Sequence, residues 1–132
     1  MARATIQIPA IDFNVALSRN VSASSFDSYG DVITNTNAGE QPDRAVWRFQ
    51  AEAGTYQLSI EYAAAQSRPV MLLLNGVTLT NNGLSEITNG WVLQCQQWAE
   101  IGSVDLVEGE NIFTISRDDV IPHIRTIKFV PE

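Results

Sequence analysis

The chain has 132 residues, a net charge of −7, eight scattered Lys and Arg residues and one cysteine, Cys95. Without a basic cluster that could release counterions, we expect no binding to nucleic acid. The single cysteine excludes an internal disulfide, and no apolar run approaches the ~20 residues of a membrane span.

The length fits one domain, residues 1–132, with enough chain to bury a core. The Met-Ala-Arg start lacks the apolar segment of a signal peptide. We therefore expect a soluble chain that is either cytoplasmic or excised from a longer protein.

The amino-terminal third is predicted to be mostly loop. Residues 5–13 form a short edge strand that Pro9 interrupts. Residues 14–43 are rich in Ser, Asn, Asp and Gly, and we expect short strands only near 15–17 and 31–34. Long loops in compact domains often carry function, so Tyr29 is a candidate ligand contact. An aromatic in such a loop more often anchors the loop to the body of the domain.

Residues 44–76 are the most regular part of the sequence and predict three strands. Trp47 lies on the apolar face of the first strand. Residues 55–62 alternate without a break, which is typical of a half-buried strand. Its four large side chains on one face are Tyr56, Leu58, Ile60 and Tyr62. Residues 70–74 then end at Asn75-Gly76, a strong hairpin signal.

The strand over residues 70–74 carries apolar side chains on both faces. If Val70 faces the core, Met71 and Leu73 face away from it, where a solvated strand is usually polar. We expect the amino-terminal loop to cover them. The alternative is a partner, with a dimer formed through these two residues.

The rest of the chain predicts further short strands and no helix. The predicted strands are residues 77–80, 92–98, 101–106, 112–116 and 125–130. Short strands at regular spacing with turn signals between them predict an all-β, antiparallel β-sandwich. Trp47 and Trp98, both within strands, are expected in the core.

Five phrases in one order resemble the family 6 and family 35 carbohydrate-binding modules. They are AEAGTYQLSIEYA, RPVMLLLNG, NGW, WAEIGSVDLVEGENIFTI and PHIRTIKF. The resemblance covers about two thirds of the chain and implies a single jelly-roll, galactose-binding-like domain. It also implies lectin-like, non-catalytic glycan binding beside a catalytic or adhesive partner, and a secreted or cell-surface location if the chain is an excised domain.

Few of the family's sugar-binding positions hold a matching residue in this sequence. The Gly-Trp aromatic matches Trp91, and the Asn of the last loop falls on His123, which can still bond a hydroxyl. The early aromatic is missing from residues 40–43, unless Tyr29 or Phe26 substitutes. The family's calcium ligands are also missing, because their positions hold Pro9, Ile11 and Arg125. The resemblance therefore implies no metal, and we expect no other cofactor.

The residues themselves also favour Trp91 as a ligand contact. It ends a polar loop after Asn89-Gly90, and an aromatic face packs well on the C–H face of a sugar. Asn82, Asn89 and Asp118 are candidate hydroxyl partners, although such residues also make ordinary turns.

Catalysis finds little support in the sequence. The only histidine is not accompanied by a Gly-x-Ser-x-Gly elbow, and we expect no enzyme activity. The alternative function is a structural or protein-interaction sandwich that has lost its sugar site.

Overall fold

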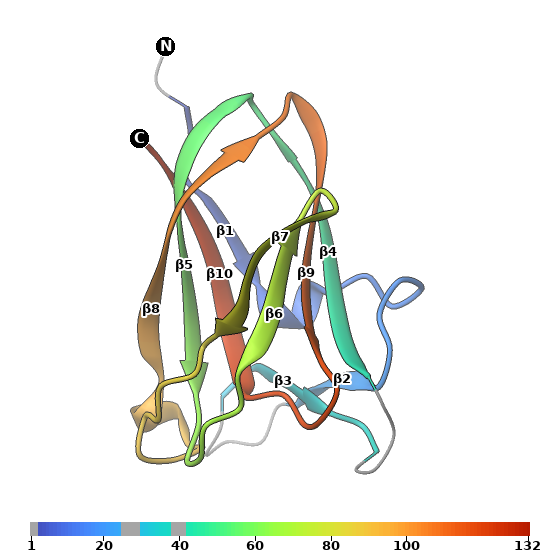
Figure 1. Ribbon diagram of the computed structural model, residues 1–132, viewed down its shortest axis with the longest axis vertical. Coiled ribbons are helices and arrows are strands. Elements are labelled where there is room, and N and C mark those ends of the chain that lie inside the picture. The colour runs from blue at the N-terminus through green and yellow to red at the C-terminus, as the bar shows by residue number, and fades with distance from the viewer. Residues whose placement is uncertain (1–2, 25–29, 38–41) are drawn as a thin grey trace.

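Two antiparallel sheets pack face to face, and each joins strands that are distant in the sequence (Figure 1). The computed structural model describes residues 3–24, 30–37 and 42–132. The strands are β1 (Ile6–Pro9), β2 (Val21–Ser24), β3 (Val32–Asn35), β4 (Asp43–Ala51), β5 (Gly54–Ala63), β6 (Val70–Leu74), β7 (Val77–Gly83), β8 (Gln97–Leu106), β9 (Gly109–Arg117) and β10 (His123–Pro131). Two 3-10 turns, η1 (Ala10–Asp12) and η2 (Leu93–Cys95), lie between them. No helix of the described part could cross a membrane.

The predicted strand over residues 55–62 lies inside the first sheet. That sheet has the order β2-β3-β10-β5-β8, with β1 also paired to β10, and the second has the order β4-β9-β6-β7. β5 pairs with β10 on one side and with β8 on the other. Its four large alternating side chains are all buried. The predicted all-β, antiparallel sandwich is confirmed.

Aromatic rings tie the two sheets together. Trp47 on β4 is buried, and its ring centroid lies 6.0 Å from that of Phe113 on β9. Phe113 meets Phe129 of the opposite sheet edge-on at 5.9 Å. The Trp47 indole N–H donates to the Ala10 carbonyl at 3.0 Å, so its only polar group is satisfied. The predicted core position of Trp47 is therefore confirmed.

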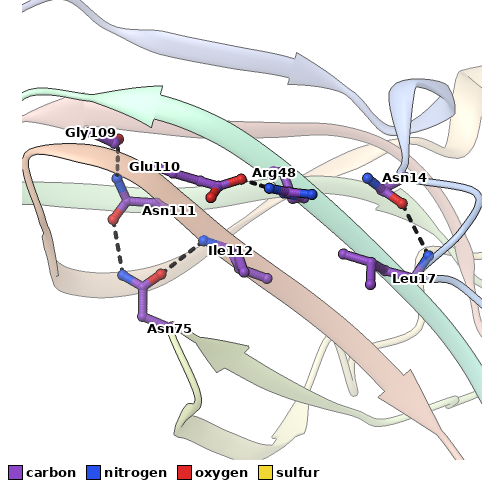
Figure 2. Close-up of polar contacts among 8 residues, drawn as sticks. All are labelled: Asn14, Leu17, Arg48, Asn75, Gly109, Glu110, Asn111 and Ile112. Carbon is purple, nitrogen blue, oxygen red and sulfur yellow. Dashed lines mark hydrogen bonds and ion pairs between the residues drawn. The ribbon is translucent and has the colours of Figure 1, made fainter.

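Asn111 joins two turns through a fully bonded, buried carboxamide (Figure 2). Its Nδ2 donates to the carbonyls of Val107 and Gly109, and its Oδ1 accepts from the Val107 N–H and from Asn75 Nδ2. Asn75 Oδ1 accepts from the Ile112 N–H at 2.8 Å. The φ of 51° at Asn75 suits the predicted hairpin turn. This asparagine pair therefore supports the fold.

Two predicted strands are wrong, and local turns take their place. Residues 15–17 lie in a turn in which the Asn14 Oδ1 accepts from the Leu17 N–H at 3.0 Å (Figure 2). Over residues 92–98, η2 comes first and β8 starts only at Gln97. Both faces of that segment mix polar and apolar groups, so a strand there has no clear face to bury.

Two apolar side chains predicted to be covered are exposed. Trp98 is 43% exposed, and Lys128 Nζ lies 4.3 Å from its ring centroid. Met71 is 39% exposed and Leu73 is half-buried. All three lie in strands, where the alternation turns some side chains away from the core. The core position of Trp98 and the covering of Met71 are therefore corrected.

Candidate functional site

Thr88 pins the loop between β7 and β8, which carries Trp91, to the end of β5. The Thr88 N–H donates to the Ala64 carbonyl at 2.8 Å, and the Thr88 Oγ1 accepts from the Ala64 N–H at 2.8 Å. The Tyr62 hydroxyl adds a bond to the Glu86 carbonyl at 2.8 Å. Thr88 is buried, so these bonds are shielded from water. The body of the sandwich therefore fixes the path of this loop.

The connections β5–β6, β7–β8 and β9–β10 all lie at the end of the sandwich opposite the chain termini (Figure 1). Arg68 from the first connection, Trp91 from the second and His123 at the start of β10 are in contact. The ring centroids of Trp91 and His123 are 4.8 Å apart, and the His123 Nδ1 lies 3.2 Å from the Trp91 carbonyl oxygen. The Arg68 guanidinium carbon lies 4.1 Å from the Trp91 ring centroid. Trp91 is half-buried and packs on the core. We call these three residues the Trp91 cluster.

Arg68 is held in place over the ring. Its Nη1 donates to the Ile121 carbonyl at 3.0 Å. With the Gln66 carboxamide turned so that its oxygen faces the guanidinium, that oxygen accepts from Arg68 Nε and Nη2 at 3.2 Å each. Burial, followed by the charge of Arg117, lowers the pKa of Arg68. An arginine nevertheless stays protonated in proteins, so a fixed positive charge lies on Trp91.

The imidazole of His123 is the titratable group of the cluster. Burial lowers its pKa from the ordinary value, and the nearby charge of Arg68 acts in the same direction. The contact with the Trp91 carbonyl raises the pKa but does not offset the burial. At neutral pH the ring is therefore neutral, and one ring nitrogen can accept a hydrogen bond.

Ile121 in the loop between β9 and β10 is fixed from two sides. Its carbonyl accepts from Arg68, and its N–H donates to the Asp43 Oδ2 at 3.2 Å. Asn20 Nδ2 donates to the other Asp43 oxygen. Asp43 is buried, and burial raises the pKa of its carboxyl despite these bonds. This network holds the loop that leads into His123.

The structure brings together only part of the predicted site. Trp91 and His123 are in contact. Asn89 is exposed on the same loop as Trp91, with a φ of 72°, and Asp118 is exposed in the loop before His123. Tyr29 lies outside the described residues, as does Phe26.

Asn82 does not lie in the Trp91 cluster. It is exposed on β7 and lines a separate cavity between the two sheets. Its N–H donates to the Thr80 Oγ1 at 3.1 Å. Asn82 and Trp91 are therefore close in the sequence but belong to different surfaces of the protein.

Sequence reasoning missed Arg68 as a member of the cluster. It appeared only in the Arg-Pro pair that precedes β6. Its place before a proline, in a short polar connection, signals an extended residue at a strand end. That the guanidinium would reach the Trp91 ring depends on tertiary packing.

The residues at the family's calcium position do not fit a metal. Pro9, Ile11 and Arg125 line one cavity together with Asp12 and Asp31. The Arg125 guanidinium is a fixed positive charge there, and its Nη1 donates to the Glu61 Oε1 at 3.0 Å. In the described part of the chain, no three His, Cys, Asp or Glu residues gather to hold a metal ion.

Comparison with solved structures identifies the class of fold. A family 35 carbohydrate-binding module from Clostridium thermocellum superposes with a TM-score of 0.78 at 20% identity, over 98% of this chain and 99% of that one. The β-(1,4)-mannanase GH26-CBM35 of Podospora anserina gives a TM-score of 0.70 at 18% identity, over 97% of this chain and 28% of that one. The insecticidal crystal protein Cry2Aa gives 0.72 at 16% identity, over 97% of this chain and 21% of that one.

No family model matches the chain, and no curated protein matches it in sequence. The chain has the β-sandwich fold of the family 35 modules, so the fold that the resemblance implied is confirmed. The likeness to Cry2Aa shows that this fold is not confined to those modules. Function must therefore be argued from the site.

Proposed function

We propose that the protein is a non-catalytic carbohydrate-binding module that holds a glycan at the Trp91 cluster. The observation that supports this most is the position of Trp91, a half-buried aromatic on a pinned loop at one end of the sandwich. The fold shared with family 35 modules agrees with this role.

The chemistry of the cluster suits a hydroxylated ligand. The indole offers an apolar surface, and the neutral His123 can accept a bond from a sugar hydroxyl. Asn89 and Asp118 are exposed on the two flanking loops, and we propose them as further polar contacts for the ligand. Because Arg68 covers part of the Trp91 ring, a pyranose must share that surface with the guanidinium.

Tyr29 remains our candidate for the second aromatic face of the site. A single shared stacking surface and a few hydrogen bonds that compete with water leave little surplus after the costs of association. We therefore expect modest affinity.

The biological role we propose is to keep a catalytic or adhesive partner close to its glycan. The chain matches only 28% of the length of the Podospora anserina mannanase, whose name joins a GH26 and a CBM35 part. A β-sandwich that binds sugar without catalysis can serve by holding an attached catalytic or adhesive domain near the glycan.

A glycan-array screen of the protein tests this function. We expect a small set of related sugars to bind, and we expect Trp91→Ala to remove those signals. An array without any hit, or hits that are unchanged in the variant, would contradict the proposal.

The alternative is an assembly module with a dimer through Met71 and Leu73. Opposite these two residues on β9 are Ser116 and Thr114, so polar side chains interrupt the outward face. We therefore expect a monomer by size-exclusion chromatography. A dimer that Leu73→Asp converts into a folded monomer would favour the alternative.

A further inference from the structure

The chain contains the dipeptide Asn-Gly at three places, and the structure holds each one differently. The pairs are Asn75-Gly76, Asn82-Gly83 and Asn89-Gly90. In such a pair the backbone nitrogen of the glycine can attack the side-chain carbonyl of the asparagine, because glycine has no side chain to hinder the approach. The shared sequence gives the three pairs similar intrinsic reactivity, so the fold decides which of them reacts.

Asn75 is protected by its own hydrogen bonds (Figure 2). Its Nδ2 donates to the Asn111 Oδ1 at 2.9 Å, and its Oδ1 accepts from the Ile112 N–H at 2.8 Å. The Asn75 N–H also donates to the Ile112 carbonyl at 2.8 Å. Attack on this carboxamide requires the side-chain bonds to break and the hairpin turn to open. We therefore expect the Asn75-Gly76 pair to react slowly in the folded protein.

Asn82 is held by the strand in which it lies. Asn82 and Gly83 are the last two residues of β7, and Gly83 is buried and pairs with Val70 on β6. The Asn82 Nδ2 lies 3.5 Å from the Ser85 Oγ, a long hydrogen bond. To reach the Asn82 side chain, the Gly83 nitrogen must leave the extended path of the strand. The backbone therefore restrains this pair more than its side chain does.

Asn89 has neither restraint. It is exposed in the loop between β7 and β8, outside any strand. In the described part of the chain, no hydrogen bond involves the Asn89 carboxamide or the Gly90 N–H. Neither reacting group must therefore lose a partner before the two can meet.

We propose that Asn89 is a modification site, where the Gly90 nitrogen displaces ammonia from the Asn89 carboxamide. A bond forms between the Gly90 nitrogen and the Asn89 Cγ, and the bond from Cγ to Nδ2 breaks. The released amino group leaves as ammonia with the proton of the Gly90 amide. Water then opens the cyclic imide at either carbonyl and gives aspartate or isoaspartate. Water is the only other reactant.

The modification alters the support of the Trp91 cluster. Thr88, one residue before Asn89, is fixed to the end of β5 by hydrogen bonds. Gly90, one residue after it, has no room for a side chain, because a Cβ there would lie 2.6 Å from the Cys95 Sγ. Isoaspartate adds a methylene to the main chain between these two residues, so Gly90 and Trp91 must shift. This consequence does not depend on the function proposed for the cluster.

The test is to incubate the full chain at mildly alkaline pH, folded and in urea, and to map deamidation by mass spectrometry. Cleavage after glutamate places Asn89 in residues 87–100 and the other two pairs in residues 62–86. Fragmentation by electron transfer distinguishes isoaspartate from aspartate. In the folded protein we expect Asn89 to react at least about tenfold faster than Asn75, because only Asn75 must first open its bonds. In urea the rates of the three pairs should converge.

Asn89→Gly is the matched control, because glycine accepts the φ of 72° at this position and carries no carboxamide. The incubated parent should show new NMR signals for the ring of His123, the only histidine, which contacts the Trp91 carbonyl. The control, incubated in the same way, should keep its starting His123 signals. Equal rates for the three pairs in the folded protein, or an Asn89 that stays intact while the urea sample reacts, would overturn the proposal. Isoaspartate at position 89 with unchanged His123 signals would overturn it as well.

Discussion

The guanidinium of Arg68 lies over the indole of Trp91, with its carbon 4.1 Å from the ring centroid. A cation on an aromatic face contributes roughly 0.5–1 kcal/mol at exposed sites and more where water is excluded. This contact therefore competes with any ligand that packs on the same face. It also links the loop before β6 to the loop before β8.

Arg68→Ala should uncover the Trp91 ring. We expect stronger acrylamide quenching of indole fluorescence, measured in a Trp98→Phe background, because Trp98 is itself 43% exposed and Trp47 is buried. Arg48→Ala removes an exposed arginine paired with Glu110 and should leave quenching unchanged. Equal quenching in the Arg68 variant and its parent would show that the guanidinium does not shield the ring.

The central strand β5 and the hairpin after β6 could be predicted because local patterns dictate them. The alternation over residues 55–62 has only one face that can be buried, and Asn75-Gly76 suits one kind of turn. The mixed segment 92–98 has no such face, so the local bonds of η2 determine its path.

The site could be predicted only in part. The family resemblance identified Trp91 and His123 by their positions in its motifs. Their packing depends on where loops distant in the chain meet. Arg68 reaches the Trp91 ring only through this tertiary arrangement. Asn82 lies on β7 and lines another cavity, away from the Trp91 cluster. Trp98 was misplaced because alternation alone does not say which of two mixed faces is outward.

Asn111→Ala should destabilise the fold strongly. The buried side chain bonds both Val107 backbone groups, the Gly109 carbonyl and Asn75, so its loss leaves several polar groups without partners. We expect a loss of about 2–4 kcal/mol in the free energy of unfolding. Urea denaturation measures it, with Asn81→Ala at an exposed position of β7 as the control. A similar small change in both variants would contradict the structural role.

Stability should fall as the pH falls below about 6.5 because of His123. Its pKa is lowered in the folded state, so the unfolded chain binds the proton more readily, and stability is lost as the pH falls toward the folded pKa. The chain has one histidine, so His123→Asn should flatten this part of the curve. Asp43 contributes with the opposite sign, but it is present in both proteins and cancels. Parallel curves of melting temperature against pH would refute the assignment.

Calcium should not stabilise the protein. Arg125, paired with Glu61, places a positive charge in the cavity where the family's ion would lie, beside Pro9 and Ile11, whose side chains offer no oxygen. Thermal melts with calcium and with chelator should have the same midpoint, because only a ligand of the folded state raises it. A rise of several degrees with calcium would place a metal site in this chain.

Trp91→Ala should lower the free energy of unfolding by about 1–2 kcal/mol, because the side chain is half-buried, against ~3–5 kcal/mol for a buried tryptophan such as Trp47. The variant should therefore remain folded by circular dichroism and be usable in binding studies. Trp98→Ala is the matched control, since it also removes an indole that lies under a cation.

Calorimetric titration of the best array glycan into the parent, Trp91→Ala and Trp98→Ala tests the central claim most directly. If the Trp91 cluster holds the sugar, the Trp98 variant should bind as the parent does, and the Trp91 variant should lose at least about tenfold in affinity, or 1.4 kcal/mol. Parental affinity in a folded Trp91→Ala protein would contradict the account.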